Sequence, residues 1–292
     1  MASFINTNMA SLNTQRNLNA SQGALATSIQ RLSSGLRVNG AKDDAAGMAI
    51  GSGMSAIIRG QTVAMRNAND AISFSQTAEG AMNNVRDNLQ RMRELAVQSA
   101  NATNSGSDRT ALNTEFNQLQ LEINRITDGT TFNNINVFAA ATLTFQVGAG
   151  TTAATEQIAI VNGNMTSSGT SALKIASVTS TNTTGSTVAF TTGADVLTAV
   201  DALDAITKID SALTVVNTVT TNQGAYQNRF AAVVSVLQVS NENQTQARSR
   251  IMDTDYAAET ATMARGQILQ QAGMAMLAQA NQLPNGVLAL MR

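Results

Sequence analysis

Long stretches of the chain carry apolar side chains at alternating spacings of three and four residues. This spacing places the apolar groups along one side of an α-helix, which then packs against another helix along its length. The longest such stretch extends from Met54 to Ala96, with one slip near Ser75. It predicts a helix of about 55 residues, roughly 80 Å long at a rise of about 1.5 Å per residue. Other helices are needed to cover so long a surface.

Two later segments have a matching pattern. Residues 112–126 predict a shorter helix that ends at the turn signal of residues 127–129, and residues 206–237 predict a second long helix. The second seam includes polar residues, which cost stability but can fix the register between two helices. These polar residues are Thr220, Gln223 and Gln227.

The two ends of the chain also carry apolar seams. The N-terminal seam consists of Leu18, Leu25, Ile29, Leu32 and Leu36. Residues 254–282 predict a C-terminal helix with a broad apolar face that includes Ile268 and Met276. We expect this helix to break at residues 284–286, because Pro284 cannot donate a helical hydrogen bond. The simplest arrangement pairs the N-terminal helix with the C-terminal one.

The middle of the chain has a different pattern, with short β-like runs separated by Gly, Asn, Ser and Thr. These runs are residues 143–147, 157–160, 172–175 and 187–190. We therefore predict a mainly α fold of long antiparallel helices, which form a terminal coiled coil and a helical rod. A small insert rich in β-hairpins, at about residues 139–192, interrupts the rod.

Composition agrees with this fold and narrows the function. Aromatic residues make up 3% of the chain, so large core anchors are few, and abundant small side chains allow helices to approach closely. The 18 basic and 19 acidic residues are scattered, which argues against nucleic-acid or membrane-surface binding. No apolar run approaches the roughly 20 residues of a membrane span.

Several kinds of chemistry are excluded by missing residue types. The chain has no Cys and no His, which rules out disulfides, zinc–imidazole sites and Ser-His-Asp catalysis. We expect no enzyme activity, no cofactor and no metal, and we interpret the 13 Met residues as adaptable packing elements. Residues 1–6 have neither a basic nor an apolar signal region, so we expect a soluble chain that, if exported, uses no cleaved signal peptide.

A pliant connector interrupts the helical pattern in "QRLSSGLRVNGAKDDAAGMAI", residues 30–50. Gly35, Asn39 and Gly40 are poor helix formers, and glycine adopts positive φ angles at little cost. The connector ends near Lys42, and the carboxylate of either Asp43 or Asp44 is suited to cap the next helix.

The ends of the chain resemble bacterial flagellins. The similarity rests on "INTNMASLNTQRNL", on the connector phrase above, on "LQRMRELAVQSAN" and on "ILQQAGMAMLAQANQLPNGVL". It covers about the first 145 and the last 95 residues. It implies a structural subunit that polymerises into the extracellular filament of the bacterial flagellum, which is used for motility. It also implies export of the unfolded chain by the flagellar type III apparatus.

The resemblance further implies a division into two domains. Residues 1–42 with 254–292 would form an inner coiled coil that lines the filament channel, and residues 43–253 an outer rod. The short insert would leave little or no outer variable domain. The terminal seams would serve assembly. The connector residues Gly35, Asn39, Gly40 and Lys42, with residues 249–255 opposite, would act as a hinge.

The same resemblance implies partners other than copies of the chain. These are the export chaperone, the filament cap and hook-junction proteins, and the host flagellin-sensing Toll-like receptor. From the residues alone, the charged groups of "QRMRELAVQ" are the solvated face of a helix. The family instead gives receptor contacts at Gln90, Arg91, Glu94, Leu95, Gln98 and Glu115.

Some alternatives remain open at this point. The Ser- and Thr-rich residues 166–192 fit either a solvated loop region or O-glycosylation. A zinc protease insert, which some flagellins carry, is excluded because the chain has no His. A hook–filament junction protein of the same architecture, or a secreted coiled-coil scaffold, would share the terminal seams. The receptor-contact phrase and "QANQLPNGVL" favour flagellin.

Overall fold

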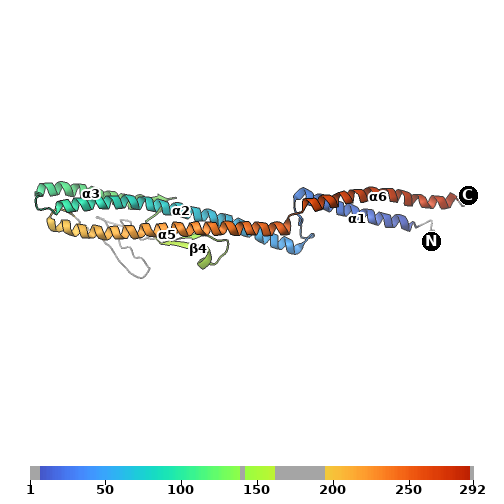
Figure 1. Ribbon diagram of the computed structural model, residues 1–292, viewed down its shortest axis with the longest axis horizontal. Helices are drawn as coiled ribbons and strands as arrows, with labels where there is room; N and C mark the ends of the chain where they lie inside the picture. Colours follow the sequence, from blue (N-terminus) through green and yellow to red (C-terminus); the bar gives the residue numbers. More distant parts are fainter. Residues whose placement is uncertain (1–6, 139–141, 162–194, 290–292) are drawn as a thin grey trace. The chain divides into compact units, whose positions relative to one another are not determined.

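A computed structural model describes residues 7–138, 142–161 and 195–289 (Figure 1). Its helices are α1 (Met9–Ser34), α2 (Ala45–Ser99), α3 (Gly106–Gly129), α4 (Ala153–Glu156), α5 (Ala199–Met252) and α6 (Tyr256–Ala289). Its strands are β1 (Thr131–Phe132), β2 (Ile135–Asn136), β3 (Thr142–Gln146) and β4 (Gln157–Val161). The chain divides into a terminal unit, residues 1–58 with 242–292, and a middle unit, residues 59–241.

The predicted fold class is confirmed, since long antiparallel helices account for most of the described chain. The helix α2 has 55 residues, as the apolar period predicts, and α5 has 54. The strands β3 and β4 pair antiparallel, with Leu143 opposite Ile160 and Phe145 opposite Ile158. The predicted runs at 172–175 and 187–190, and the Ser- and Thr-rich residues 166–192, lie outside the described residues.

The hairpin formed by β1 and β2 was not predicted from the sequence. Its two-residue turn consists of Asn133 and Asn134, with φ angles of 50° and 62°. Such turns need two positive φ angles, which Asn tolerates better than most residues. The Asn pair between Phe132 and Ile135 was the available signal.

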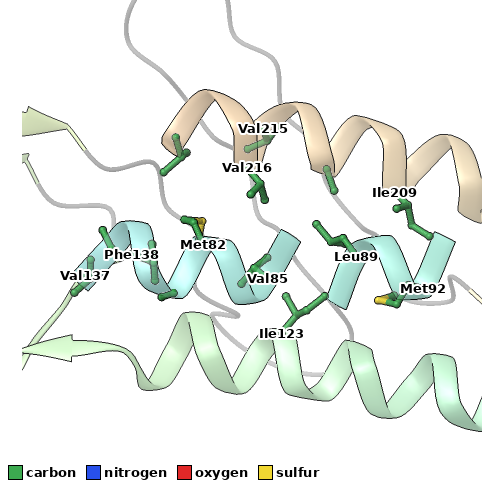
Figure 2. Packing of buried hydrophobic residues seen from close by; sticks show 14 of the residues in the cluster. Met82, Val85, Leu89, Met92, Ile123, Val137, Phe138, Ile209, Val215 and Val216 are labelled. Atoms are coloured by element: carbon green, nitrogen blue, oxygen red, sulfur yellow. The ribbon is translucent and has the colours of Figure 1, made fainter. Parts of the chain in front are cut away.

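The core of the middle unit forms where α2 packs between α3 and α5. Figure 2 shows side chains of α2 pointing toward Ile123 of α3 on one side and toward Ile209 and Val216 of α5 on the other. Met82, Leu89 and Met92 of α2 are each 0% exposed. The apolar side chains of α2 therefore pack against α3 and α5 at the same time.

Aromatic contacts attach the β3–β4 hairpin to the helices. The ring of Phe145 in β3 lies 6.0 Å from the ring of Phe74 in α2 and 5.8 Å from that of Phe230 in α5. Such pairs stabilise by roughly 0.5–1.5 kcal/mol beyond the area they bury. Phe74, Phe145 and Phe230 thus meet at the place where the hairpin contacts the helices.

The polar seam residues of α5 take different partners. Gln227 donates from Nε2 to Glu79 Oε2 of α2 at 2.8 Å, and so ties the two helices together. Gln223 is 1% exposed. Thr220 instead donates to the Val216 carbonyl of its own helix at 2.9 Å. A cross-helix bond of the Gln227 type favours one register over a slipped one.

In the terminal unit, α1 and α6 lie side by side (Figure 1), so the predicted pairing of the two ends is confirmed. Leucines of α1 pack over glycines of α6 at matched seven-residue intervals. An added Cβ would lie 3.4 Å from Leu25 Cδ1 at Gly266, and 3.2 Å from Leu18 Cδ1 at Gly273. This spacing is that of an antiparallel coiled coil with glycines beneath the large residues.

The predicted break of α6 at Pro284 is wrong, because the helix continues to Ala289. Pro284 has no N–H to donate to the carbonyl four residues earlier, that of Ala280. The side chain of Asn8 donates to this carbonyl instead, with an Nδ2–O distance of 2.7 Å. A donor from the other end of the chain thus replaces the bond that proline removes.

Candidate assembly and recognition surfaces

The connector is held by backbone hydrogen bonds to the end of α5. Arg37 N donates to the Met252 carbonyl at 2.6 Å, and Thr254 N donates to the Gly35 carbonyl at 3.0 Å. Leu36 and Asp253 form an isolated antiparallel bridge. Residues 35–38 and 251–254 therefore pair as two short antiparallel segments within the terminal unit.

The connector residues differ in backbone conformation. Gly35 has a φ of 70° and is the one described glycine with a positive φ. Asn39 donates from Nδ2 to the Leu36 carbonyl at 3.1 Å, Gly40 has open space around it, and Lys42 is exposed. The left-handed conformation that favours glycine is thus present at Gly35 and not at Gly40.

Asp44, rather than Asp43, caps the start of α2. Its Oδ1 accepts from the backbone N of Gly47 at 2.8 Å, as a capping residue does. Asp43 Oδ2 accepts from the backbone N of Asn39 at 3.1 Å and of Gly40 at 3.2 Å. Asp43 therefore holds the connector, and Asp44 caps the start of α2.

A close contact that the sequence reading missed joins the start of α2 to the end of α5. Met252 is 7% exposed, and an added Cβ at Gly51 would lie 2.5 Å from its Sδ. No larger residue fits at Gly51 unless Met252 moves. The signal was the pair of buried glycines, Gly47 and Gly51, one helical turn apart.

The apolar face of α6 predicted from the sequence is directed away from α1. Ile268 and Met276 are 66% and 59% exposed. The side toward α1 instead includes Met263, Gly266, Gly273 and Leu277, which are buried or half-buried. We call the exposed residues Ile268, Leu269 and Met276 the outer stripe of α6.

The predicted seam of α1 is divided between the two sides of its helix. Leu18, Leu25 and Leu32 are half-buried, and the first two contact α6. Leu36 is half-buried in the connector. Ile29 is exposed, as are Met9 and Leu12. The terminal unit therefore leaves large apolar side chains of both helices open to solvent, which is unusual unless another surface covers them.

An exposed ion-pair cluster joins α2 to α3. Arg91 donates from Nε to Glu115 Oε1 at 2.9 Å and from Nη1 to Glu94 Oε2 at 3.0 Å. The hydrogen bonds that Arg91 donates to Glu115 and then to Glu94 raise the pKa of Arg91 above its ordinary value. We call the exposed residues Gln90, Arg91, Glu94, Gln98 and Glu115 the Arg91 surface.

Leu95, the remaining predicted receptor contact, is not part of this surface. It is 1% exposed and belongs to the core of the middle unit. The apolar period of α2 directs it inward, one turn from Arg91, so its contribution to any contact is indirect. The resemblance to flagellins predicted Leu95 as a contact residue, but it did not predict that its side chain points into the core.

Arg93, on the same turn of α2, reaches the other neighbouring helix. It donates to both carboxylate oxygens of Asp210 in α5, at 2.7 and 3.3 Å. Hydrogen bonding to Asp210 is the largest cause of the raised pKa of Arg93. The arginines on either side of Met92 thus tie α2 to α3 and to α5.

The described residues hold no cluster of three or more His, Asp or Glu side chains that could bind a metal ion. Within the same residues, no helix is long and apolar enough to cross a membrane. The conspicuous surface features are an uncovered apolar stripe and a charged cluster on paired helices. Together they are typical of a helical protein that makes contacts with other proteins.

Comparison with known proteins gives the family. The profile described as bacterial flagellin N-terminal helical region matches residues 5–142, and that of the C-terminal helical region matches residues 206–291. A flagellin of Xenorhabdus nematophila is 43% identical over all of both chains. One of Halalkalibacterium halodurans is 42% identical over 99% of this chain and all of its own. The chain belongs to the bacterial flagellin family.

A third relative is similar over a part of each chain. A flagellin of Salmonella typhimurium is 59% identical over 150 residues, which are 51% of this chain and 30% of that one. Family membership makes the chain a structural subunit of the extracellular flagellar filament, which assembles with copies of itself and is not an enzyme. The full-length matches to flagellins favour this role over that of a hook–filament junction protein.

Proposed function

We propose that the outer stripe of α6 and the exposed apolar residues of α1 are the surfaces by which each subunit binds its neighbours in the filament. The observation that carries this proposal is the position of α1, which already occupies the opposite side of α6. A second copy is the partner, because a filament subunit meets copies of itself along its whole length. Burying one large apolar side chain contributes about 1.5–3 kcal/mol.

The test is the critical concentration for polymerisation of the full-length chain, measured by sedimentation. Ile268→Ser and Met276→Ser should each raise it roughly tenfold or more, since a tenfold change corresponds to about 1.4 kcal/mol. Asn19→Ser, at an exposed polar position of α1, is the control and should leave it unchanged. Unaltered critical concentrations for both stripe variants would place the subunit contacts elsewhere.

We further propose that residues 1–42 with 254–292 line the filament channel and that residues 43–253 form the outer part. The paired α1 and α6 support this, because both ends of the chain then assemble together. A chain that lacks residues 1–30 should keep the helical middle unit and fail to polymerise, as judged by circular dichroism and electron microscopy. Normal filaments from it would contradict the proposal.

For secretion we propose export of the unfolded chain by the flagellar type III apparatus, with the export chaperone, filament cap and hook-junction proteins as partners. The absence of Cys supports this, since no disulfide can hold the chain folded. Fusion of a very stable domain to the chain should block its export, and a destabilised variant of that domain should restore it. Equal export of both fusions would contradict an unfolded intermediate.

We also propose that the Arg91 surface of the free subunit binds the host flagellin-sensing Toll-like receptor. The supporting geometry is an exposed cluster in which Arg91 is held by Glu115 and Glu94 in one conformation. Such a preordered, charged patch costs little to immobilise on binding. Leu95 supports the patch from beneath without contacting the receptor.

A reporter-cell assay with purified subunits tests the receptor proposal. Arg91→Ala and Glu115→Ala should each raise the half-maximal concentration roughly tenfold or more, the effect of removing a strong contact residue. The matched control is Arg125→Ala, which breaks the exposed Arg125–Glu122 pair on α3, the helix that carries Glu115. Undiminished signalling by both variants, with unchanged thermal unfolding, would remove this site.

A further inference from the structure

We propose that Asn8 stands in for the N–H that Pro284 lacks, so that the last turns of α6 fold only when the N-terminus of α1 is docked. The proposal concerns the two ends of the chain within the terminal unit. It rests on a hydrogen bond between residues 272 positions apart, at the carbonyl that the proline leaves without its helical donor.

Both ends of the Asn8 carboxamide are used. Its Oδ1 accepts from the backbone N of Ser11 at 3.1 Å, which caps α1. Its Nδ2 donates to the Ala280 carbonyl at 2.7 Å. Ala280 is 6% exposed, so water has little access to replace the amide. A carboxylate at this position could still cap α1 but has no hydrogen to donate.

A neighbouring contact fixes the same register. Ser11 donates from Oγ to Asn281 Oδ1 at 2.8 Å, one residue beyond Ala280. The next contacts along the pair are Leu18 over Gly273 and Leu25 over Gly266. These two polar contacts lie near the ends of the chain, where a slip of one helix along the other would break both of them.

This coupling has a consequence for assembly, which rests on the proposed role of the terminal unit. Loss of Asn8 would leave an unsatisfied carbonyl within α6 and loosen residues 281–289. The two ends would then become ordered together rather than one after the other. The proline thus makes the C-terminal turns dependent on the N-terminus.

The experiment is a double-mutant cycle in filaments of the full-length chain, read by amide hydrogen exchange of peptides that cover residues 281–289. Asn8→Asp keeps the cap and removes the donor, and Asn8→Ser keeps a capping oxygen and removes the carboxamide Nδ2 without adding a charge. Each should speed exchange about fivefold, the factor for one net hydrogen bond. Pro284→Ala restores a backbone donor to Ala280, so in that background both Asn8 variants should have little effect.

Equal acceleration with and without the Pro284→Ala substitution would overturn the coupling and leave Asn8 as a helix cap alone. No acceleration by Asn8→Asp would overturn it as well. If Asn8→Asp prevents polymerisation, recovery of filaments in the double variant supports the proposal and failure to recover contradicts it. Failure of the unaltered chain to polymerise would instead refute the proposed function.

Discussion

Leu18 of α1 packs directly over Gly273 of α6, with so little room that an added Cβ would lie 3.2 Å from Leu18 Cδ1. Seven residues later in α1 and seven residues earlier in α6, the corresponding contact of Leu25 with Gly266 is looser, at 3.4 Å. Each pair places a leucine side chain over a glycine, and the two pairs differ in the room that is left for an added methyl group. Substituting alanine at each glycine therefore compares the gain in helix propensity with the cost of a tighter contact.

Gly266→Ala should stabilise the paired termini by up to about 1 kcal/mol, because alanine favours the helix and its methyl group makes an ordinary contact. Gly273→Ala should gain less, since Leu18 must shift to admit the methyl group. The midpoint temperature of thermal depolymerisation of the filaments shows which substitution stabilises more. A larger gain at Gly273 would show that the helix spacing is not set by these pairs.

Gly35→Ala should destabilise the connector by about 1–2 kcal/mol, because residue 35 adopts a left-handed φ of 70°. Gly40→Ala is the matched control, with no positive φ and nothing within 4 Å of the added Cβ. We propose that the connector, residues 35–42 with 249–255, is the hinge that adapts subunits to a supercoiled filament. Altered filament pitch for Gly35→Ala alone is the expected result, and wild-type pitch would place the hinge elsewhere.

Phe230→Ala should destabilise the middle unit by about 3–5 kcal/mol, since the ring is 0% exposed and contacts Phe145 of the hairpin. Val236→Ala lies on the same helix but is 68% exposed, and should change stability by less than about 0.5 kcal/mol. Urea unfolding followed by circular dichroism measures both. Similar losses for the two variants would contradict the position of the core.

Helix α3 should lose stability in acid through its N-terminal capping box. Hydrogen bonds from the Ser105 side chain and then its backbone lower the pKa of Asp108 below the ordinary 3.8. A lowered pKa in the folded state means that the stabilisation is complete above the unfolded pKa and disappears as the pH falls through the folded one. Asp108→Asn removes this titration.

The measurement is the difference in urea midpoint between the unaltered chain and Asp108→Asn across pH. This difference should be constant above about pH 5 and should shrink as the pH falls below about 4. Glu122, whose pKa is lowered by Arg125, titrates in both chains and cancels in the difference. A difference independent of pH would show that the Asp108 charge contributes nothing to the cap.

Much of the fold could be predicted from the sequence, because a helix leaves its period in the positions of its apolar residues. The seam from Met54 to Ala96 gave most of the length of α2, and the β-like runs at 143–147 and 157–160 gave β3 and β4. The missing Cys and His excluded whole classes of chemistry. The phrases at the two ends gave the family, since long runs of matching residues leave little room for coincidence.

Other features depended on contacts between segments far apart in the chain. Both sides of α6 carry side chains at helical spacing, and the side with Gly266 and Gly273 is the less apolar one. It faces α1, and Gly266 and Gly273 let the two helices approach closely beneath Leu25 and Leu18. Leu95 similarly looked like part of the exposed phrase around Arg91, until packing against α3 and α5 placed it inside.

The sequence by itself determined where the helices lie, because local periodicity and capping depend on residues a few positions apart. Only the tertiary structure decided which faces meet and where α6 ends. Pro284 is a helix breaker by its own chemistry, yet the helix passes it, because Asn8 supplies a donor to Ala280 from the opposite end of the chain. No local pattern contains that partner.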